Sequence, residues 1–178
     1  ASVSENAARC SITFGAPSKT FNIAGIVCSY AIVPDENLRK RFYSWLEANE
    51  FGAAPIFSSI ATIAAFRKGE EWRKQMLAYI EGNIEFVESF CRERIPQVKP
   101  LRPQASFLVW LDCRELGLDH DSLISLFIDK AGLALNDGEM FNPGGEGFMR
   151  LNIGTSRQII ENALLRLEKA TLILTKRS

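Results

Sequence analysis

The chain has 178 residues, of which 47% are hydrophobic, and its 21 basic and 21 acidic residues cancel. This length suits one domain or one and a half with a packed core, and zero net charge disfavours nucleic-acid binding, which needs a positive field. Because no apolar stretch approaches a membrane span and residues 1–6 lack the features of a signal peptide, we expect a globular protein of the cytoplasm without a membrane partner.

The first predicted elements lie on either side of Lys19. Residues 10–14 alternate polar and apolar side chains like a short strand, which Gly15 and Pro17 then interrupt. Residues 26–33 form a nearly continuous apolar run, which predicts a second strand covered on both faces. Lys19 therefore follows a strand end, where sheet proteins place catalytic groups, and a lysine that forms an imine needs a fixed, partly desolvated position. The alternative is a solvated loop lysine, which is more common for an arbitrary Ser-Lys pair.

Three helices are predicted between residues 35 and 94. The first runs to about residue 47 with Asp35 as its N-cap, and the second covers residues 56–66, where isoleucines recur at helical spacing. Gly69 separates the second helix from a long one over residues 70–94. The long helix carries a sustained apolar stripe, which predicts one buried face. This stripe consists of Met76, Ile80, Ile84, Val87 and Cys91.

Strands and helices alternate in the rest of the chain. Residues 105–112 predict a central strand, residues 121–130 an amphipathic helix, and residues 133–135 a short strand. Thr155 and Gln158 have the spacing of a capping box for a last helix. The apolar stripe of that helix includes Ile160, Leu164 and Leu167. This order predicts the α/β class, with one open sheet and helices packed against it.

The cysteines and the single histidine offer little to a metal site or a nucleophilic relay. His120 stands between Asp119 and Asp121 where a helix should begin, and this trio is typical of a solvated helix cap. The cysteines lie far apart in apolar segments and form no C-x-x-C pair, which is typical of reduced core cysteines. They are Cys10, Cys28, Cys91 and Cys113. We therefore expect no bound metal.

An arginine lies in an apolar strand near the C-terminus. Residues 148–153 alternate with period two, so Arg150 shares one strand face with Phe148 and Asn152. Burial of an unpaired guanidinium is too costly, so Arg150 faces either water, as on an edge strand, or an anion. A guanidinium matches the geometry of a carboxylate, which every amino-acid substrate carries. Arg157 is a second candidate for such a contact.

Residues 18–25 read Ser-Lys-Thr-Phe-Asn-Ile-Ala-Gly. This segment resembles the lysine motif of the class I/II aminotransferase family, fold type I of the pyridoxal phosphate enzymes, and most of all its MalY/PatB-type subgroup of carbon–sulfur β-lyases. The resemblance implies that Lys19 forms the Schiff base with pyridoxal 5'-phosphate and that Ser18 lies near the cofactor phosphate. The general family signature has Gly or Ser where this chain has Ala16, and a phosphate-binding Arg where it has Val27.

In the same family, an arginine within a Phe-x-Arg-Leu-Asn strand binds the substrate α-carboxylate, and Arg150 matches that arginine. The resemblance covers about residues 10 to 175. It implies that residues 1–34 are the C-terminal part of the cofactor-binding large domain, and that residues 35–178 are linking helices and the small C-terminal α/β domain. The chain is then expected to be the C-terminal part of a longer polypeptide, whose upstream part supplies the partner of the pyridine nitrogen and most phosphate donors. A homodimer is expected on the same ground.

These features imply an enzyme of amino-acid metabolism. In both candidate reactions Arg150 anchors the substrate carboxylate and Lys19 removes the α-proton as general base. A β-lyase acting on cystathionine or a cysteine conjugate then expels a thiolate and yields pyruvate and ammonia, whereas an aminotransferase releases a keto acid. Residues 18–25 and 145–154 favour the lyase. The alternative of another class is a non-catalytic fragment or dimerisation module.

Overall fold

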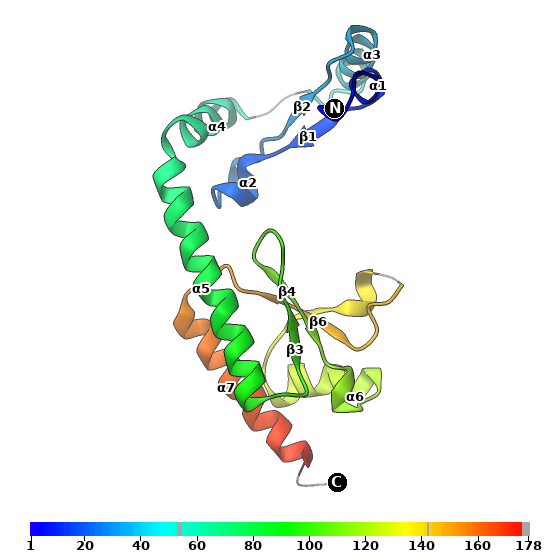
Figure 1. Ribbon diagram of the computed structural model, residues 1–178. Coiled ribbons are helices and arrows are strands. Elements are labelled where there is room, and N and C mark those ends of the chain that lie inside the picture. The colour runs from blue at the N-terminus through cyan, green and yellow to red at the C-terminus, as the bar shows by residue number, and fades with distance from the viewer. Residues whose placement is uncertain (53–54, 142, 176–178) are drawn as a thin grey trace. The chain divides into compact units, whose positions relative to one another are not determined.

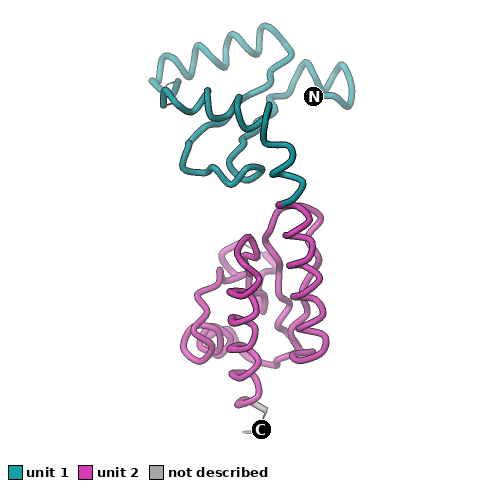
Figure 2. Tube along the Cα trace, turned by 90° about the vertical axis from the view of Figure 1, so that its left-hand side faces the viewer, with its two compact units in different colours: residues 1–75 teal, residues 76–178 magenta. Residues whose placement is uncertain are grey.

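A computed structural model describes residues 1–52, 55–141 and 143–175. The chain divides into two compact units, residues 1–75 and residues 76–178 (Figure 2). The division falls inside helix α5 (Glu70–Arg94), which begins in the first unit and continues in the second (Figure 1). The resemblance implied a boundary between two family domains at residue 34. That boundary is not the division between the two compact units, and it stays a prediction.

The first unit contains a two-stranded antiparallel ribbon and several helices. Asp35 caps α3 as predicted, since its carboxylate accepts a hydrogen bond from the backbone N–H of Leu38 at 2.8 Å. Gly69 ends α4, also as predicted. The elements before α5 are α1 (Glu5–Cys10), β1 (Thr13–Gly15), α2 (Pro17–Thr20), the 3-10 turn η1 (Ala24–Ile26), β2 (Tyr30–Ile32), α3 (Glu36–Ala48) and α4 (Ile56–Lys68).

The two strands that flank Lys19 are shorter and more exposed than predicted. Cys10 ends helix α1 instead of opening a strand, and its side chain is exposed. Between residues 26 and 33 only β2 is extended, because η1 is followed by Val27 in the left-handed region at φ 51°. Tyr30 and Ile32 keep 42% and 54% of their surface exposed. A ribbon of two short strands buries little surface, so the prediction of a strand covered on both faces is wrong for this unit by itself.

The second unit is a four-stranded sheet with helices packed on it. All three strand pairs are antiparallel, in the spatial order β3-β4-β6-β5. Its elements after α5 are β3 (Lys99–Leu101), β4 (Leu108–Asp112), η2 (Arg114–Leu116), α6 (His120–Ser125), the π-helical turn η3 (Leu126–Lys130), β5 (Asn136–Asp137), η4 (Gly138–Phe141), β6 (Phe148–Asn152) and α7 (Arg157–Thr175). The α/β class predicted from the sequence is confirmed, with β4 as a central strand.

One hydrophobic core joins the sheet to its helices. α5 and α7 lie along the same side of the sheet (Figure 1), and Arg94 of α5 donates to Glu168 of α7 at 2.9 Å. The stripe predicted for α5 is confirmed, since Ile80, Ile84, Val87 and Cys91 are buried and Met76 packs against them. The stripe of α7 is confirmed by the burial of Ile160, Leu164 and Leu167. These helices therefore cover one sheet face and leave the other for side chains that are not in the core.

The short strand expected at residues 133–135 lies elsewhere. Leu133 is buried and donates its backbone N–H to the carbonyl of Phe127 at 2.7 Å, so it closes the preceding π-helical turn. Gly132, in the left-handed region at φ 64°, makes this reversal possible. The chain becomes extended only at residues 136–137, where it pairs with β6.

The capping box expected at Thr155 and Gln158 is wrong. α7 begins at Arg157, so the cap position falls on Ser156, and the Gln158 side chain contacts residues further along its own helix. The backbone N–H of Arg157 donates to the hydroxyl of Tyr79 on α5 at 2.8 Å. A tertiary contact thus satisfies a helix-terminal donor that the sequence pattern assigned to a local cap. No helix in the described ranges has the length and apolar character needed to cross a membrane.

Candidate functional site

Lys19 lies in the last turn of the short helix α2, directly after β1, as the sequence predicts for a residue that follows a strand end. Pro17 occupies the first turn, where its fixed φ favours helix entry. Ser18 is half-buried, and its carbonyl accepts from the backbone N–H of Ile23 at 3.0 Å. The Lys19 side chain is exposed, and among the residues that the structure describes its amine has neither a hydrogen bond nor an ion pair. The amine is therefore available to a ligand.

The segment after Lys19 is anchored within the first unit by an aromatic cluster. Phe21 is buried, with its ring centroid 5.3 Å from that of Phe66 on α4 and 6.5 Å from that of Trp72 on α5. The hydroxyl of Ser58 on α4 donates to the carbonyl of Ile26. These contacts fix both ends of the loop that follows the lysine.

Arg150 lies on the sheet face opposite the core. Four residues form one row across the four strands, because Leu101 faces Trp110, Trp110 faces Arg150, and Arg150 faces Asn136. Side chains that face one another across strands share a sheet face. The next residues along β6, Met149 and Leu151, point into the core. The alternation predicted around Arg150 is therefore confirmed, with the arginine half-buried.

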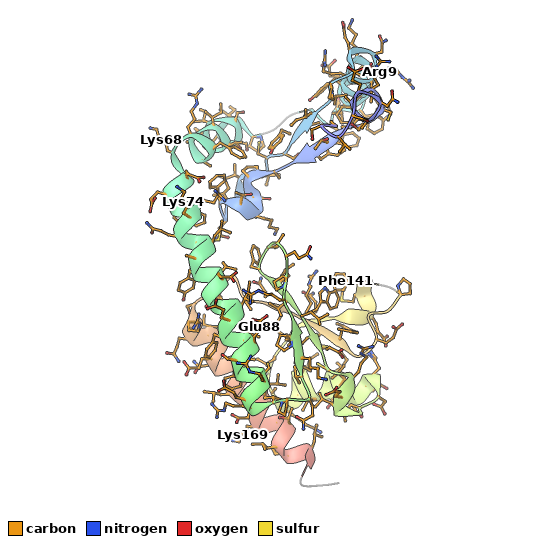
Figure 3. All side chains as sticks on the ribbon, in the orientation of Figure 1. Arg9, Lys68, Lys74, Glu88, Phe141 and Lys169 are labelled. Carbon is orange, nitrogen blue, oxygen red and sulfur yellow. The ribbon has the colours of Figure 1, made fainter. Side chains whose placement is uncertain are left out.

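Two contacts and one unpartnered nitrogen define the environment of the Arg150 guanidinium. Its Nη2 donates to the Oδ1 of Asn136 at 2.9 Å, and its Cζ lies 4.3 Å from the ring centroid of Phe141 on η4. The Phe141 side chain is labelled in Figure 3. Its Nε is buried, and it has no hydrogen-bond partner among the residues that the structure describes. A buried donor without an acceptor costs about 1–3 kcal/mol, so the described residues leave one hydrogen bond of this guanidinium unmade.

Aromatic rings extend this face on the other side of Arg150. The Trp110 ring makes edge contacts with Phe141 at 5.3 Å and with Phe148 at 6.1 Å between centroids. A hollow of about 310 Å³ opens here, lined by these three rings, Leu101 and residues 143–145. The face thus offers an apolar surface next to a guanidinium.

The other cations on this side of the sheet are already paired. Arg114 donates to both carboxylate oxygens of Asp112, at 2.9 and 2.7 Å, and Lys99 is paired with Glu115. The hydrogen bond from Arg114 holds the pKa of Asp112 below its ordinary value, because it favours the charged carboxylate. In the described part of the chain, Arg150 has no carboxylate partner. Arg150 can therefore bind an anionic ligand on this face without breaking an ion pair.

Arg157, the second arginine considered from the sequence, is held by α5. Its Nε donates to the Oδ1 of Asn83 at 2.8 Å, and its Cζ lies 4.7 Å from the ring centroid of Phe86. Both contacts tie the start of α7 to α5. Its guanidinium already serves a structural role.

Around His120 the predicted helix cap is confirmed. Asp119 accepts from the backbone N–H of Ser122 at 2.8 Å. Hydrogen bonding from the side chain and then from the backbone of Ser122 holds the pKa of Asp119 below its ordinary value. The His120 ring contacts two further carboxylates, which the sequence did not suggest: its Nε2 is 3.4 Å from Asp137 Oδ2 and its Nδ1 is 3.0 Å from Glu139 Oε1. Across the described ranges, no group of three or more His, Cys, Asp and Glu side chains has an arrangement suited to a metal.

The candidate residues fall in both units. Ser18 and Lys19 belong to the first unit and Arg150 to the second. Sequence reasoning missed Asn136 and Phe141, since the short strand was expected at residues 133–135 and lies at residues 136–137. The feature that identifies these two residues is the row of aromatic and polar side chains around Arg150, and this row forms only when the strands are paired.

Comparisons with known proteins find relatives in sequence and in structure. No protein-family model matches it. Cystathionine beta-lyase PatB of Bacillus subtilis (strain 168) is 41% identical over 170 residues, which cover 96% of this chain and 44% of that protein. The crystal structure of cystalysin from Treponema denticola, which contains pyridoxal 5'-phosphate, superposes with a TM-score of 0.93 at 32% identity, over 97% of this chain and 44% of that one.

A pyridoxal phosphate-bound structure of a putative aminotransferase from Clostridium difficile 630 has a TM-score of 0.91 at 36% identity, over 96% of this chain and 44% of that one. The chain thus spans less than half the length of each of these three proteins. Both the sequence similarity and the structural similarity extend over nearly all of its residues. The chain is similar over nearly all of its residues to MalY/PatB-type cystathionine β-lyases, and it has the fold of part of the fold type I pyridoxal phosphate-dependent enzymes.

Proposed function

We propose that the intact protein containing this chain is a pyridoxal phosphate-dependent carbon–sulfur β-lyase that converts cystathionine or a cysteine conjugate to pyruvate, ammonia and a thiol. The observation that carries the proposal is the unpaired, buried Nε of Arg150, in a chain that is 41% identical to a cystathionine beta-lyase. A guanidinium with a free donor on a half-buried sheet face suits a carboxylate. Every substrate of this class carries one.

Lys19 and Ser18 of the first unit are suited to bind the aldehyde and the phosphate of the cofactor. The exposed Lys19 amine has no competing partner among the described residues, so it is free to react with the cofactor aldehyde. Ser18 precedes it on the same turn, and we propose that its hydroxyl donates to the cofactor phosphate. When bound, the cofactor supplies an electron sink for the charge that develops at the substrate Cα.

Two side chains of this chain would then act on the substrate. Arg150 holds the α-carboxylate through Nε and orients the Cα–H bond, and hydrogen bonds of this charged type contribute about 1.5–3 kcal/mol each. Lys19 accepts the proton from Cα as general base. As the C–S bond breaks, the electron pair leaves with the sulfur, and Lys19 in its ammonium form donates the proton to the departing thiolate. Neither step requires a further charged group from the described residues.

An aminotransferase is the second candidate, and it is favoured by the aminotransferases among the similar proteins. That reaction would need the same two residues, Arg150 to hold the carboxylate and Lys19 to move the proton. The two activities differ in their need for a second substrate. A lyase releases pyruvate in a single pass, whereas an aminotransferase requires a keto acid to regenerate the cofactor.

The test is an assay of the intact protein with cystathionine, in which pyruvate is measured without any added keto acid. We expect pyruvate release, its loss in Lys19→Ala, and its retention in Lys40→Ala, an exposed lysine that pairs with Glu36 at 2.7 Å on α3. Turnover that depends strictly on an added keto acid would refute the lyase proposal and favour the aminotransferase.

Cofactor attachment is tested separately from turnover. The intact protein is mixed with pyridoxal 5'-phosphate and reduced with borohydride, and the modified peptides are mapped by mass spectrometry. We expect the adduct at Lys19, because its loop is fixed by the Phe21 cluster. Labelling spread evenly over the surface lysines would favour a non-catalytic fragment or dimerisation module.

We also propose that the intact protein acts as a cytoplasmic homodimer, as resemblance to this family implies. Light scattering coupled to size-exclusion chromatography measures the assembly directly. A monomeric mass for the active holoenzyme would contradict the dimer.

A further inference from the structure

The single histidine of the chain makes contacts that neither the helix cap nor the proposed reaction explains. His120 is the first residue of α6, and its ring lies between the carboxylates of Asp137 and Glu139, at 3.4 and 3.0 Å. The three side chains are partly exposed, at 36%, 27% and 42% of their surface. His120 thus joins the start of a helix to the segment that follows it in the sheet, β5 and η4.

That segment, residues 136–141, carries both side chains that touch the Arg150 guanidinium. Asn136 accepts from its Nη2, and the ring of Phe141 lies beside its Cζ. β5 has only two residues, so its ladder with β6 supplies few hydrogen bonds. The segment is further held by a bond from the backbone N–H of Glu139 to Asp137 Oδ1 at 3.0 Å.

The contact of His120 therefore acts on Asp137 and Glu139, two of the four residues between Asn136 and Phe141. An imidazole between two carboxylates can donate from either ring nitrogen, and both when protonated. Loss of this contact would leave a two-residue strand and a 3-10 turn to fix the position of Asn136 and Phe141. Small displacements of such supporting residues lower the affinity of a binding site without removing any group that touches the ligand.

We propose that His120 is a positioning residue for Arg150. By bridging Asp137 and Glu139, it holds residues 136–141 in place. Asn136 and Phe141 then fix the guanidinium, and its Nε remains the donor for a substrate carboxylate. The inference rests on the proposed carboxylate-binding role of Arg150 and deepens it. It assigns a binding role to a residue that lies 30 positions before Arg150 in the chain.

The first test is the steady-state kinetics of His120→Ala in the intact holoenzyme. We expect KM for the amino-acid substrate to rise about tenfold, a change equivalent to about 1.4 kcal/mol, with kcat nearly unchanged because only substrate binding is weakened. His120→Gln, which keeps one donor, restores part of the affinity. Asp121→Ala, at the next and exposed position of α6, is the control and leaves KM at the wild-type value.

A double-mutant cycle tests the route of the effect. If His120 acts through the segment that holds Asn136, the variant His120→Ala/Asn136→Ala raises KM by no more than the larger of the two single changes. Full additivity would mean that the two residues act independently, and it would overturn the proposal. If His120→Ala unfolds the protein, Glu139→Gln removes one charge from the same contact and takes its place in the cycle.

A binding measurement separates this inference from the proposed function. In protein labelled with ¹⁵N-arginine, the Nε resonance of Arg150, assigned with Arg150→Lys, is followed during titration with propionate. We expect propionate to shift this resonance in the wild type, and His120→Ala to require about tenfold more propionate. Equal titrations in both proteins would overturn the role of His120 while the carboxylate role of Arg150 stands. No shift in the wild type would overturn the carboxylate role and the inference with it.

Discussion

Asn83 is expected to be the most sensitive polar position of the second unit. Its side chain on α5 is fully buried, with its Nδ2 donating to the carbonyls of Ile153 and Thr155 at 3.0 and 3.1 Å and its Oδ1 accepting from Arg157 Nε at 2.8 Å. One amide thus fixes the turn that joins the strand of Arg150 to α7. Asn83→Leu keeps the number and branching of the side-chain heavy atoms and removes all three hydrogen bonds.

The magnitude follows from the number of bonds lost. A hydrogen bond contributes about 1 kcal/mol net, so we expect the free energy of unfolding to fall by about 3 kcal/mol. Urea denaturation measures this as a lower midpoint at an unchanged slope. Asn162→Leu is the matched control: Asn162 is exposed on α7, so its change is expected to stay within about 0.5 kcal/mol. A loss below about 1 kcal/mol for Asn83→Leu would refute the structural role of these bonds.

Other predictions concern core packing and thiol reactivity. Leu164 is 1% exposed and its neighbour Leu165 is 37% exposed. In urea denaturation, Leu164→Ala is therefore expected to destabilise the protein by about 2–5 kcal/mol, and Leu165→Ala by far less. Equal losses of stability would contradict the packing of α7. Burial raises the pKa of Cys91 and Cys113 to about 12, and the thiolate is the reactive form. At mildly alkaline pH, iodoacetamide should therefore modify the exposed Cys10 first and reach the two buried thiols only after urea is added, whereas equal rates in the folded protein would contradict their burial.

Local sequence signals were enough to predict the long helices α3, α4, α5 and α7, but not the short helices α1 and α2. The bounds of α5 follow from Gly69 before it and Pro96 after it, and its buried face follows from apolar residues at helical spacing. Asp35 marks the start of α3 because its side chain accepts from the first turn. These signals depend on residues only a few positions apart, so a single sequence contains them in full.

Features set by distant parts of the chain could not be predicted in this way. The cap of α7 comes from Tyr79, 78 residues earlier than the N–H that it accepts from. The strand β5 is only two residues long, and its position depends on pairing with β6, which comes later in the chain. Because apolar composition alone does not show which elements cover a strand, β2 was expected to be buried and is exposed.

The candidate site was likewise predictable only where its signals are local. The alternation along β6 identified the face of Arg150, and the resemblance around Lys19 identified the lysine. Asn136 and Phe141 were missed because they meet the guanidinium only after β5 and η4 have folded against β6. The unpaired Nε, on which the proposed carboxylate site depends, is visible only in the folded chain.

The central proposal is that Lys19 holds the cofactor and that Arg150 binds the carboxylate of the amino-acid substrate. A crystal structure of the intact protein with pyridoxal 5'-phosphate and a slowly reacting amino-acid analogue tests it most directly. We expect the cofactor to be joined to Lys19 before the analogue binds, and the analogue carboxylate to accept hydrogen bonds from Arg150. An analogue held at the cofactor while the Arg150 guanidinium faces solvent or another protein surface would contradict the proposal.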